Sequence, residues 1–353
     1  MNRSKYKNIL LVRTDRIGDV VLTTPAISLL RENYPDANLY FLTRQYTAPL
    51  LSHYKYLQEI IIYRPESIHK GFRGHLQLGR ELKSRQIDLA LLFYPRPGLA
   101  LALRAARIKH RVGIGYRWYS FLLNHRIFEH RKYGRRHELE YNLSLMENFI
   151  ESVPPPGQIK FDFQTDERLN LLRDKALSKL EINTGTDYVV VHPGSGGSAP
   201  NLPPAMFARI INYIARNSSL KILLAGSAME ASLINEIAAE AEGDSLTRVI
   251  GDWDLETYTS VIAKSRLFIS NSTGPMHIAR AFNIPLVAFY CPAIPCSPKR
   301  WGPYNRPDSV LAPDVEPCKT CNRQTCPHGN CLSHIEWPEI RALLDLRLAI
   351  RQE

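Results

Sequence analysis

A short apolar run that turns through one glycine into an amphipathic helix lies near the start of the chain. Residues 8–12 predict a buried strand, Gly18 turns the chain, and apolar residues at helical spacing follow as far as residue 33. Asp19 stands at this turn. Ligands of open α/β sheets bind outside the carboxyl ends of the strands, so this carboxylate is placed where an enzyme keeps a base. Because Asp is also a common helix N-cap, the turn alone supports both roles.

The second half of the chain contains the same design twice. A strand at residues 267–270 passes through small residues into a helix that begins at about Gly274. A strand at residues 188–191 opens into the loop HPGSGGSAPNLPP before a helix that starts near Pro203. The free amides and the dipole of a helix N-terminus attract anions. The sequence therefore predicts two anion-binding loops in this half.

Predicted strands alternate with helices along the whole chain, which is typical of parallel, doubly wound sheets. A helix over residues 137–152 is expected to end at the proline run 154–156, the best candidate for a linker, with the boundary near residues 153–165. The predicted domains are residues 1–160 and 161–335, and a last helix lies within residues 336–353. We expect strands at 8–12, 38–43, 59–63, 88–93 and 111–114, and then at 187–191, 220–224, 247–250, 266–270 and 286–290.

The composition fits a two-domain protein of the cytoplasm. The 353 residues are 44% hydrophobic and 22% charged, enough to bury two ordinary cores. No apolar run approaches the roughly 20 residues that cross a bilayer, and the first residues lead directly into a strand without the pattern of a signal peptide. We therefore expect a cytoplasmic protein.

The excess of basic charge belongs to the first half of the chain. Residues 1–150 hold 25 Lys and Arg against 12 Asp and Glu, whereas residues 151–353 hold 20 against 22. The clusters at 104–111 and 126–136 favour an anionic partner, either an acidic acceptor or the anionic face of a membrane. A basic surface that only keeps the protein soluble is the alternative. Nothing resembles a nucleic-acid-binding module, so we expect no nucleic acid partner.

Five separated motifs appear in one order: IGDVVLTTP, HPGSG, SNSTGPMH, SPKRWGPY and a cysteine-bearing stretch. In this order and spacing the chain resembles glycosyltransferase family 9, the ADP-heptose:lipopolysaccharide heptosyltransferases. The resemblance implies an α/β fold of GT-B architecture, with two Rossmann-like domains facing a central cleft and the last helix packing back across both. The first domain would bind the acceptor and the second the nucleotide sugar.

The resemblance implies an inverting transfer of a heptose, or a similar sugar, from a nucleotide diphosphate to a lipopolysaccharide-core or related glycan acceptor. ADP-heptose is the expected donor, and peripheral contact with the cytoplasmic face of the inner membrane is compatible with such an acceptor. Two alternatives remain open at this point. One is another GT-B nucleotide-sugar enzyme, such as an epimerase, and the other is a catalytically degenerate nucleotide-sugar-binding paralogue.

The resemblance also implies roles for individual residues. Asp19 matches the catalytic aspartate, which would take the proton from the acceptor hydroxyl. Arg13 and Arg16 would contact acceptor or phosphate, or would be solvated charges, and Gly18 would let the backbone approach the ligand. The implied donor-binding residues are Gly194, Ser195, Gly196, Glu230, Ser272, Thr273, Gly274, His277, Lys299 and Arg300. His277 has a structural role as its alternative, and Glu230 has that of an ordinary helix-start glutamate.

The chain departs from the family pattern at two of these positions. The family usually carries Lys or Arg after its HPGSG loop, but residues 199–203 read APNLP. Ser272 replaces the acidic residue that often precedes the Thr-Gly of the second turn. Lys299 and Arg300 can supply the lost positive charge from a neighbouring loop. If they do not, donor affinity is lower or the protein is degenerate.

Four cysteines, Cys318, Cys321, Cys326 and Cys331, form a C-x2-C-x4-C-x4-C pattern with His328 and His334 between and after them. This spacing suits a structural zinc site, and reduced or oxidation-sensitive thiols are the alternative. Cys291 and Cys296 look incidental. We expect catalysis to need no cofactor, because helix N-termini and small-residue turns can hold the departing diphosphate without a divalent metal.

Overall fold

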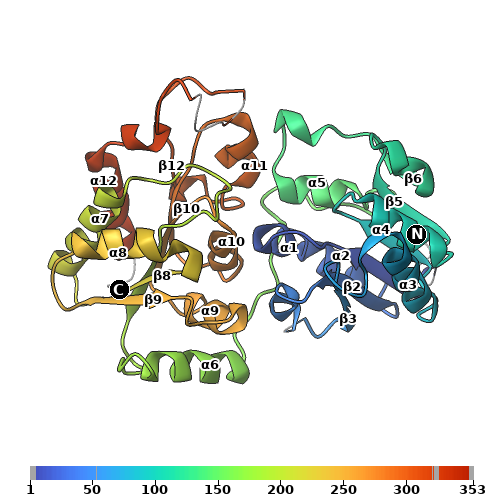
Figure 1. Ribbon diagram of the computed structural model, residues 1–353, viewed down its shortest axis with the longest axis horizontal. Helices are drawn as coiled ribbons and strands as arrows, with labels where there is room; N and C mark the ends of the chain where they lie inside the picture. Colours follow the sequence, from blue (N-terminus) through green and yellow to red (C-terminus); the bar gives the residue numbers. More distant parts are fainter. Residues whose placement is uncertain (1–4, 53, 320, 322–325, 350–353) are drawn as a thin grey trace. The chain divides into compact units, whose positions relative to one another are not determined.

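The computed structural model describes residues 5–52, 54–319, 321 and 326–349, and the chain forms two compact units (Figure 1). Unit 1 comprises Met1–Arg131 and Glu138–Asp162, and unit 2 comprises Lys132–His137 and Phe163–Glu353. The main change of unit, between Asp162 and Phe163, lies inside the segment where the sequence places the linker. The short insertion Lys132–His137 into unit 2 has no signal in the sequence.

Unit 1 is built on a six-stranded parallel sheet in the order β3-β2-β1-β4-β5-β6. Its strands are β1 (Asn8–Val12), β2 (Asn38–Arg44), β3 (Leu57–Tyr63), β4 (Leu89–Leu92), β5 (His110–Ile114) and β6 (His125–Ile127). Its helices are α1 (Ile17–Val21), α2 (Pro25–Asn33), α3 (Gly71–Lys83), α4 (Pro97–Ala105) and α5 (Glu138–Ser144), with short 3-10 turns that include η2 (Trp118–Leu122).

Unit 2 is built on a second six-stranded parallel sheet, in the order β12-β11-β10-β7-β8-β9. Its strands are β7 (Tyr188–His192), β8 (Lys221–Gly226), β9 (Leu246–Ile250), β10 (Leu267–Asn271), β11 (Leu286–Phe289) and β12 (Val310–Leu311). Its helices are α6 (Glu167–Ser178), α7 (Pro204–Asn217), α8 (Ala231–Ala239), α9 (Leu255–Ile262), α10 (Gly274–Ala281), α11 (Pro298–Trp301) and α12 (Trp337–Ala349).

Each sheet has the strand order of a Rossmann fold, in which the order reverses at one switch point. The switch point lies between β1 and β4 in unit 1 and between β7 and β10 in unit 2. All ten predicted strands are present, with ends that move by a few residues. The two additional strands, β6 and β12, have only three and two residues, too few to show a hydrophobic pattern.

Helices cover both faces of each sheet, so the central strands are mostly apolar (Figure 1). All five residues of β7, YVVVH, are buried. α7 packs on this sheet through Phe207, Ile210, Ile211 and Ile214, which recur at helical spacing and are fully buried. α12 packs on unit 2 through the buried Ile340 and Leu344. Among the described residues, no helix is both long and apolar enough to cross a membrane.

Two predicted helices are shorter than expected. The helix that follows Gly18 breaks at Thr23 and Thr24, because Pro25 has no amide to donate and the Thr23 hydroxyl bonds the Asp19 carbonyl oxygen at 2.8 Å. The helix predicted over residues 137–152 ends at Ser144. Three-residue turns then follow, in which the Met146 amide bonds the Leu143 carbonyl oxygen at 3.0 Å.

Candidate active site

Asp19 lies in the first turn of α1, directly beyond the end of β1 and at the switch point of unit 1. The N-cap position of this helix is Arg16, so Asp19 is not the N-cap. The Asp19 carboxylate instead accepts a hydrogen bond from the Arg13 guanidinium, and its side chain is 14% exposed. The carboxylate is therefore fixed in direction while part of it remains open to a ligand.

Arg13 is only 2% exposed and bonds several groups at once. Its Nε donates to Asp15 at 2.7 Å, and one Nη donates to the Asn142 side-chain oxygen at 3.0 Å. Its other Nη bonds Asp19 and lies 3.8 Å from Glu138. A buried arginine with this many partners orients the carboxylates around it. The structure thus shows Arg13 inside the protein, whereas Arg16 is exposed at the start of α1.

Helix α5 supplies the second layer of this network. Glu138 accepts a hydrogen bond from Arg131 at 2.5 Å, and the Asn142 amide nitrogen donates to the Thr23 hydroxyl at 3.2 Å. The Thr23 hydroxyl bonds the main chain of Asp19, so the network closes on α1. The sequence had no signal for Glu138 or Asn142, because more than a hundred residues separate them from Asp19.

Asp15 shares Arg13 with Asp19 and has an unusual charge environment. Burial raises the pKa of Asp15 from 3.8 to about 7, although the Arg13 guanidinium opposes this and Asp19 adds to it. Its side chain is 11% exposed. Asp15 therefore changes charge near neutral pH, next to the candidate base. Sequence reasoning missed this residue, which stands four positions before Asp19.

The loop after β7 lies at the switch point of unit 2. Gly196 and Gly197 have φ values of +53° and +76°, a conformation that glycine adopts without strain. The Ser195 hydroxyl donates to the Ala199 carbonyl oxygen at 2.8 Å, so it stabilises the loop from within. The Leu202 amide bonds the Asn271 side-chain oxygen at 2.9 Å, which ties this loop to the end of β10. Asn271 is another residue that sequence reasoning missed.

Glu230, at the start of α8, lies against the main chain of this loop. A Cβ atom added to Gly194 would be 1.5 Å from a Glu230 carboxylate oxygen, so only glycine fits beside it. The same carboxylate accepts bonds from the Ser227 amide at 2.8 Å and from its hydroxyl at 2.9 Å. Burial alone would raise the pKa of Glu230, but His192, these Ser227 bonds and the Gly196 amide outweigh it and lower the pKa.

The turn after β10 leads into α10, whose N-cap is the buried Thr273 and whose first residue is Gly274. His277 is 4% exposed, and its Nδ1 has no hydrogen-bond partner among the described residues. Burial, with repulsion from His137, lowers the pKa of His277 to about 3. His277 is therefore neutral at physiological pH. Ser272, before the N-cap, is half-buried.

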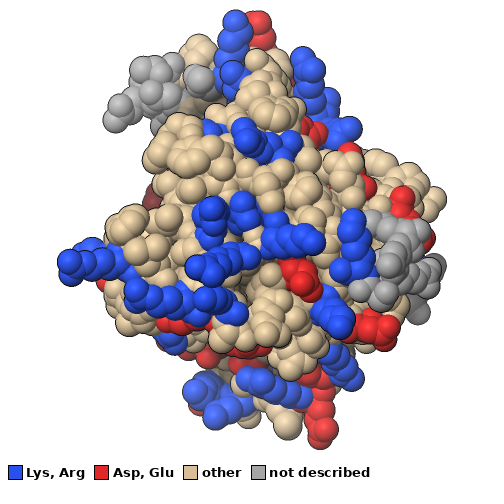
Figure 2. All heavy atoms as spheres, turned by 90° about the vertical axis from the view of Figure 1, so that its right-hand side faces the viewer, with Lys and Arg blue, Asp and Glu red and all other residues tan. Residues whose placement is uncertain are grey.

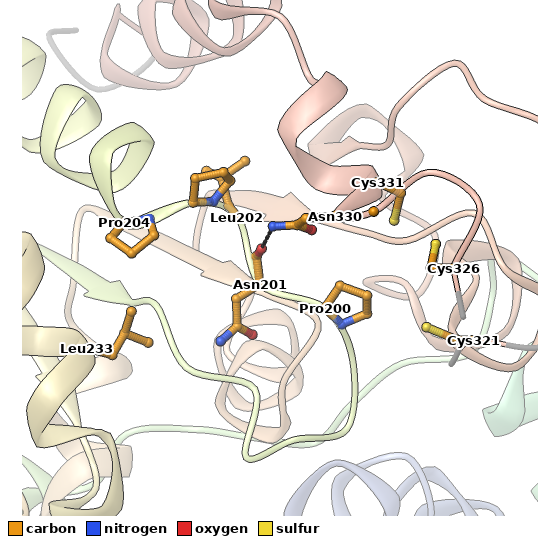
Figure 3. Close-up of a pocket in the computed structure, with 11 residues that line it drawn as sticks. Pro200, Asn201, Leu202, Pro204, Leu233, Cys321, Cys326, Asn330 and Cys331 are labelled. Atoms are coloured by element: carbon orange, nitrogen blue, oxygen red, sulfur yellow. Dashed lines mark hydrogen bonds between the residues drawn. The ribbon is translucent and has the colours of Figure 1, made fainter. Parts of the chain in front are cut away.

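Lys299 and Arg300 lie on α11, beyond the end of β11. Lys299 is exposed, and Arg300 stacks over the Trp301 ring at 4.8 Å. The segment 199–203 contributes prolines and Leu202 to an apolar cavity of about 430 Å³, next to the cysteine-bearing stretch (Figure 3). In the close-up, the Asn330 side chain donates a hydrogen bond of 2.9 Å to the Asn201 carbonyl oxygen. This bond fixes one wall of the cavity.

The cysteines gather near this cavity. Cys291 was expected to be incidental, but its Sγ lies 4.0 Å from Cys321 Sγ, and it also interacts with Cys296 and Cys331. Cys291 and Cys296 thus belong to the same cluster, which the sequence could not show because α11, β12 and the loops around them separate these two cysteines from the other four. In the described part of the chain, no three His, Cys, Asp or Glu side chains are arranged to hold one metal ion.

The model of glycosyltransferase family 9 (heptosyltransferase) matches residues 75–332. The chain belongs to glycosyltransferase family 9. The resemblance seen in the motifs is confirmed, and the protein is a glycosyltransferase. Lipopolysaccharide heptosyltransferase 3 of Escherichia coli is 27% identical over 283 residues, which cover 77% of this chain and 79% of that protein.

Two solved structures have the same fold as this family 9 chain. The family 9 glycosyltransferase from Veillonella parvula has a TM-score of 0.82 at 18% identity and covers 99% of each chain. The ADP-heptose lipopolysaccharide heptosyltransferase II of Escherichia coli has a TM-score of 0.79 at 21% identity and covers 98% of this chain and all of that one. The predicted α/β fold of GT-B type is confirmed by this likeness and by the two Rossmann-like sheets.

Proposed function

We propose that this family 9 protein is an inverting glycosyltransferase that moves a heptose from ADP-heptose to a lipopolysaccharide-core or related glycan acceptor. One observation carries the proposal: Asp19 stands beyond β1 at the switch point of unit 1, held by a buried arginine with its carboxylate partly open. The names of the relatives support the sugar and the acceptor, since both Escherichia coli proteins are lipopolysaccharide heptosyltransferases.

Asp19 takes the proton from the acceptor hydroxyl as that oxygen attacks the anomeric carbon of the donor sugar. The bond between this carbon and the diphosphate breaks on the opposite side, so the configuration inverts. A general base is effective when its orientation is fixed. Arg13 fixes the orientation of Asp19 by bonding one of its carboxylate oxygens. Arg13 is thus a positioning residue, and Arg16, exposed on the same turn, contacts the acceptor or its phosphate.

The residues of unit 2 hold the donor. Gly194, Ser195 and Gly196 present main-chain amides to the diphosphate, and Thr273 and Gly274 do the same at the N-terminus of α10. Glu230, kept ionised by its lowered pKa, accepts hydrogen bonds from the ribose hydroxyls. His277 is a neutral imidazole whose Nδ1 has no partner in the described part of the chain, so it can bond a phosphate oxygen, and Ser272 adds a hydroxyl.

The departing diphosphate gains negative charge as the sugar leaves. Lys299 and Arg300 on α11 supply the positive charge that segment 199–203 lacks. With amides and these cations, the site needs no divalent metal for catalysis. We assign acceptor binding to residues 1–160 and donor binding to residues 161–335. Among the described residues, the last helix, α12, packs on unit 2 through Ile340 and Leu344.

A nucleotide-release assay tests this function directly. The purified protein is incubated with ADP-heptose, UDP-sugars and GDP-sugars, each with and without a lipopolysaccharide-core acceptor. We expect release of a nucleoside diphosphate only from ADP-heptose and only with acceptor present. Conversion of the donor without acceptor would identify an epimerase, and donor binding without turnover in any pair would identify a degenerate paralogue. Either outcome contradicts the proposal.

The acceptor suggested by these relatives is a glycolipid, so we also propose that the protein works at the cytoplasmic face of the inner membrane. The basic charge of residues 1–150 supports this placement, because anionic lipids attract such segments.

We propose in addition a structural zinc ion held by Cys318, Cys321, Cys326 and Cys331. The spacing of these cysteines supports the site. Such an ion would hold the cysteine-bearing stretch together, with no part in the transfer step.

A further inference from the structure

One segment of unit 1 carries positive charge without any negative charge. No Asp or Glu occurs between Asp88 and Glu129, a stretch that contains α4, β5, η2 and β6. In the described part of the chain, no carboxylate forms an ion pair with a cation of this segment. Six of its seven cations are exposed, and they are Arg96, Arg104, Arg107, Lys109, Arg117 and Arg126.

The same segment exposes large aromatic side chains. Trp118 is 79% exposed and Phe121 is 65% exposed, and both belong to η2. Residues i and i+3 of a 3-10 helix lie directly above one another, so these two rings point to the same side. Phe128, just after β6, is 62% exposed and packs edge-to-face on Tyr116 with ring centroids 5.2 Å apart.

The opposite side of η2 is anchored in the unit. Tyr119 and Ser120 are 4% and 3% exposed. The Ser120 hydroxyl donates to the Ile114 carbonyl oxygen at 2.8 Å and accepts the Arg117 amide at 3.1 Å. Arg111 donates to the Leu122 carbonyl oxygen at 2.8 Å, which holds the end of η2. The exposed rings are therefore held by a fixed element in contact with water. Exposed apolar side chains of this kind mark interaction sites.

Figure 2 views the molecule from the side on which Figure 1 shows α3, α4, β5 and β6. Lys and Arg side chains gather across the middle of this face, with few Asp or Glu among them. Aromatic rings beside arginines and lysines are the composition of surfaces that rest in the interface of an anionic bilayer. The rings enter the headgroup region while the cations pair with lipid phosphates.

We propose that Trp118 and Phe121, together with the six exposed cations of residues 89–128, form the surface that docks unit 1 on an anionic lipid membrane. This deepens the proposed function, because it names the membrane contact that a glycolipid acceptor requires. The charge of the segment favours anionic lipid. The rings favour a bilayer over a nucleic acid or an acidic protein, because they protrude to one side and form no groove in which a strand or a peptide could lie.

Flotation of the full chain with vesicles tests the proposal without any sugar donor or acceptor. The vesicles are pure phosphatidylcholine, or phosphatidylcholine with about one third phosphatidylglycerol. We expect binding only to the second kind, weakened by raising salt from about 0.05 to 0.5 M. No binding to the anionic vesicles would overturn the proposal, and it would leave the transfer assay unaffected.

Two variants separate rings and charge. Trp118→Ser with Phe121→Ser, and separately Arg104→Gln with Arg107→Gln and Lys109→Gln, should each weaken binding about tenfold or more. The matched controls are the exposed apolar pair Leu171→Ser with Met229→Ser, and the exposed cations Lys175→Gln, Lys179→Gln and Lys264→Gln, all in unit 2. Controls that weaken binding as much as the test variants would contradict the proposal.

The emission of Trp118 gives a local readout. It is the one tryptophan of the described residues that is largely exposed, so its entry into the headgroup region should shift the protein's fluorescence to shorter wavelength. Trp118→Phe should keep vesicle binding and lose this shift. Binding to anionic vesicles with unchanged Trp118 emission would mean that charge alone makes the contact, and the proposed surface would be wrong.

Discussion

Arg13 holds Asp19. A guanidinium that is almost fully buried bonds the Asp19 carboxylate, which stands at the switch point of unit 1 and remains partly open. The family resemblance implies a ligand contact for Arg13, but its burial and its bonds to Asp15 and Asn142 favour a positioning role. The exposed Arg16 is the better candidate for a contact with the acceptor.

Arg13→Lys should lower kcat about 10- to 100-fold with little change in the acceptor KM, because lysine keeps the charge but lacks the planar fork that orients two carboxylates. Arg16→Ala should do the reverse, raising the acceptor KM while kcat stays close to that of the wild type. Steady-state kinetics with varied acceptor check both. An Arg13→Lys enzyme with a raised acceptor KM and an unchanged kcat would show that Arg13 contacts the acceptor.

Asp15→Asn should remove a pH dependence of stability. With its pKa raised to about 7, folded Asp15 keeps a proton that the unfolded chain loses above its pKa of 3.8. The free energy of unfolding therefore falls as pH rises through this window and is level above it. Asparagine preserves the acceptor for Arg13 without titrating, so the variant should gain stability relative to the wild type from pH 5 to pH 8.

Urea unfolding at the two pH values measures this gain. Asp36→Asn, which changes an exposed carboxylate of the same unit, is the matched control and should show no such difference. An equal effect of Asp15→Asn at both pH values would mean that Asp15 is ionised throughout the range.

Gly194→Ala should weaken donor binding, because the new Cβ would displace the Glu230 carboxylate. Loss of a charged hydrogen bond costs about 1.5–3 kcal/mol, so the donor KM should rise about 10- to 100-fold. Glu230→Ala should have a similar effect, and the double variant should add little to either. Gly185→Ala, at a glycine with open space around it, should leave the donor KM unchanged. Additive losses would show that Gly194 and Glu230 act separately.

Metal analysis and metal removal should show that the cysteine cluster holds zinc and that transfer does not depend on Mg²⁺ or Mn²⁺. Elemental analysis of the purified full chain should find about one zinc per chain, and treatment with a chelator of Mg²⁺ and Mn²⁺ should leave transfer unchanged. Less than about 0.1 zinc per chain after expression with ample zinc would rule out the structural ion. An absolute requirement for added divalent metal would contradict the amide-based donor site.

Much of the fold could be predicted because parallel strands buried on both faces leave near-continuous apolar runs, as in β4 and β7. The short edge strands β6 and β12 leave no such run. The break at Thr23 and Thr24 depends on hydroxyl bonds to the main chain that a periodic pattern does not contain. The early end of α5 depends in the same way on local turns.

The placement of the candidate-site residues was predictable where they follow a strand, as for Asp19, Ser195 and Thr273. It was not predictable where partners come from distant segments. Asn142 reaches Arg13 from α5, and Asn271 reaches the loop after β7 from β10. These contacts are long-range consequences of the fold, and neither side chain stands in a motif that marks it.

The transfer rate of Asp19→Asn tests whether Asp19 is the general base. Asparagine keeps the size of the side chain and an oxygen for Arg13, but it cannot take a proton from the acceptor. With ADP-heptose and a lipopolysaccharide-core acceptor, the variant should turn over about 100-fold or more slowly, while calorimetry shows donor affinity within about twofold of the wild type. Wild-type turnover by Asp19→Asn would show that Asp19 is not the general base, because another group would then have to accept the proton.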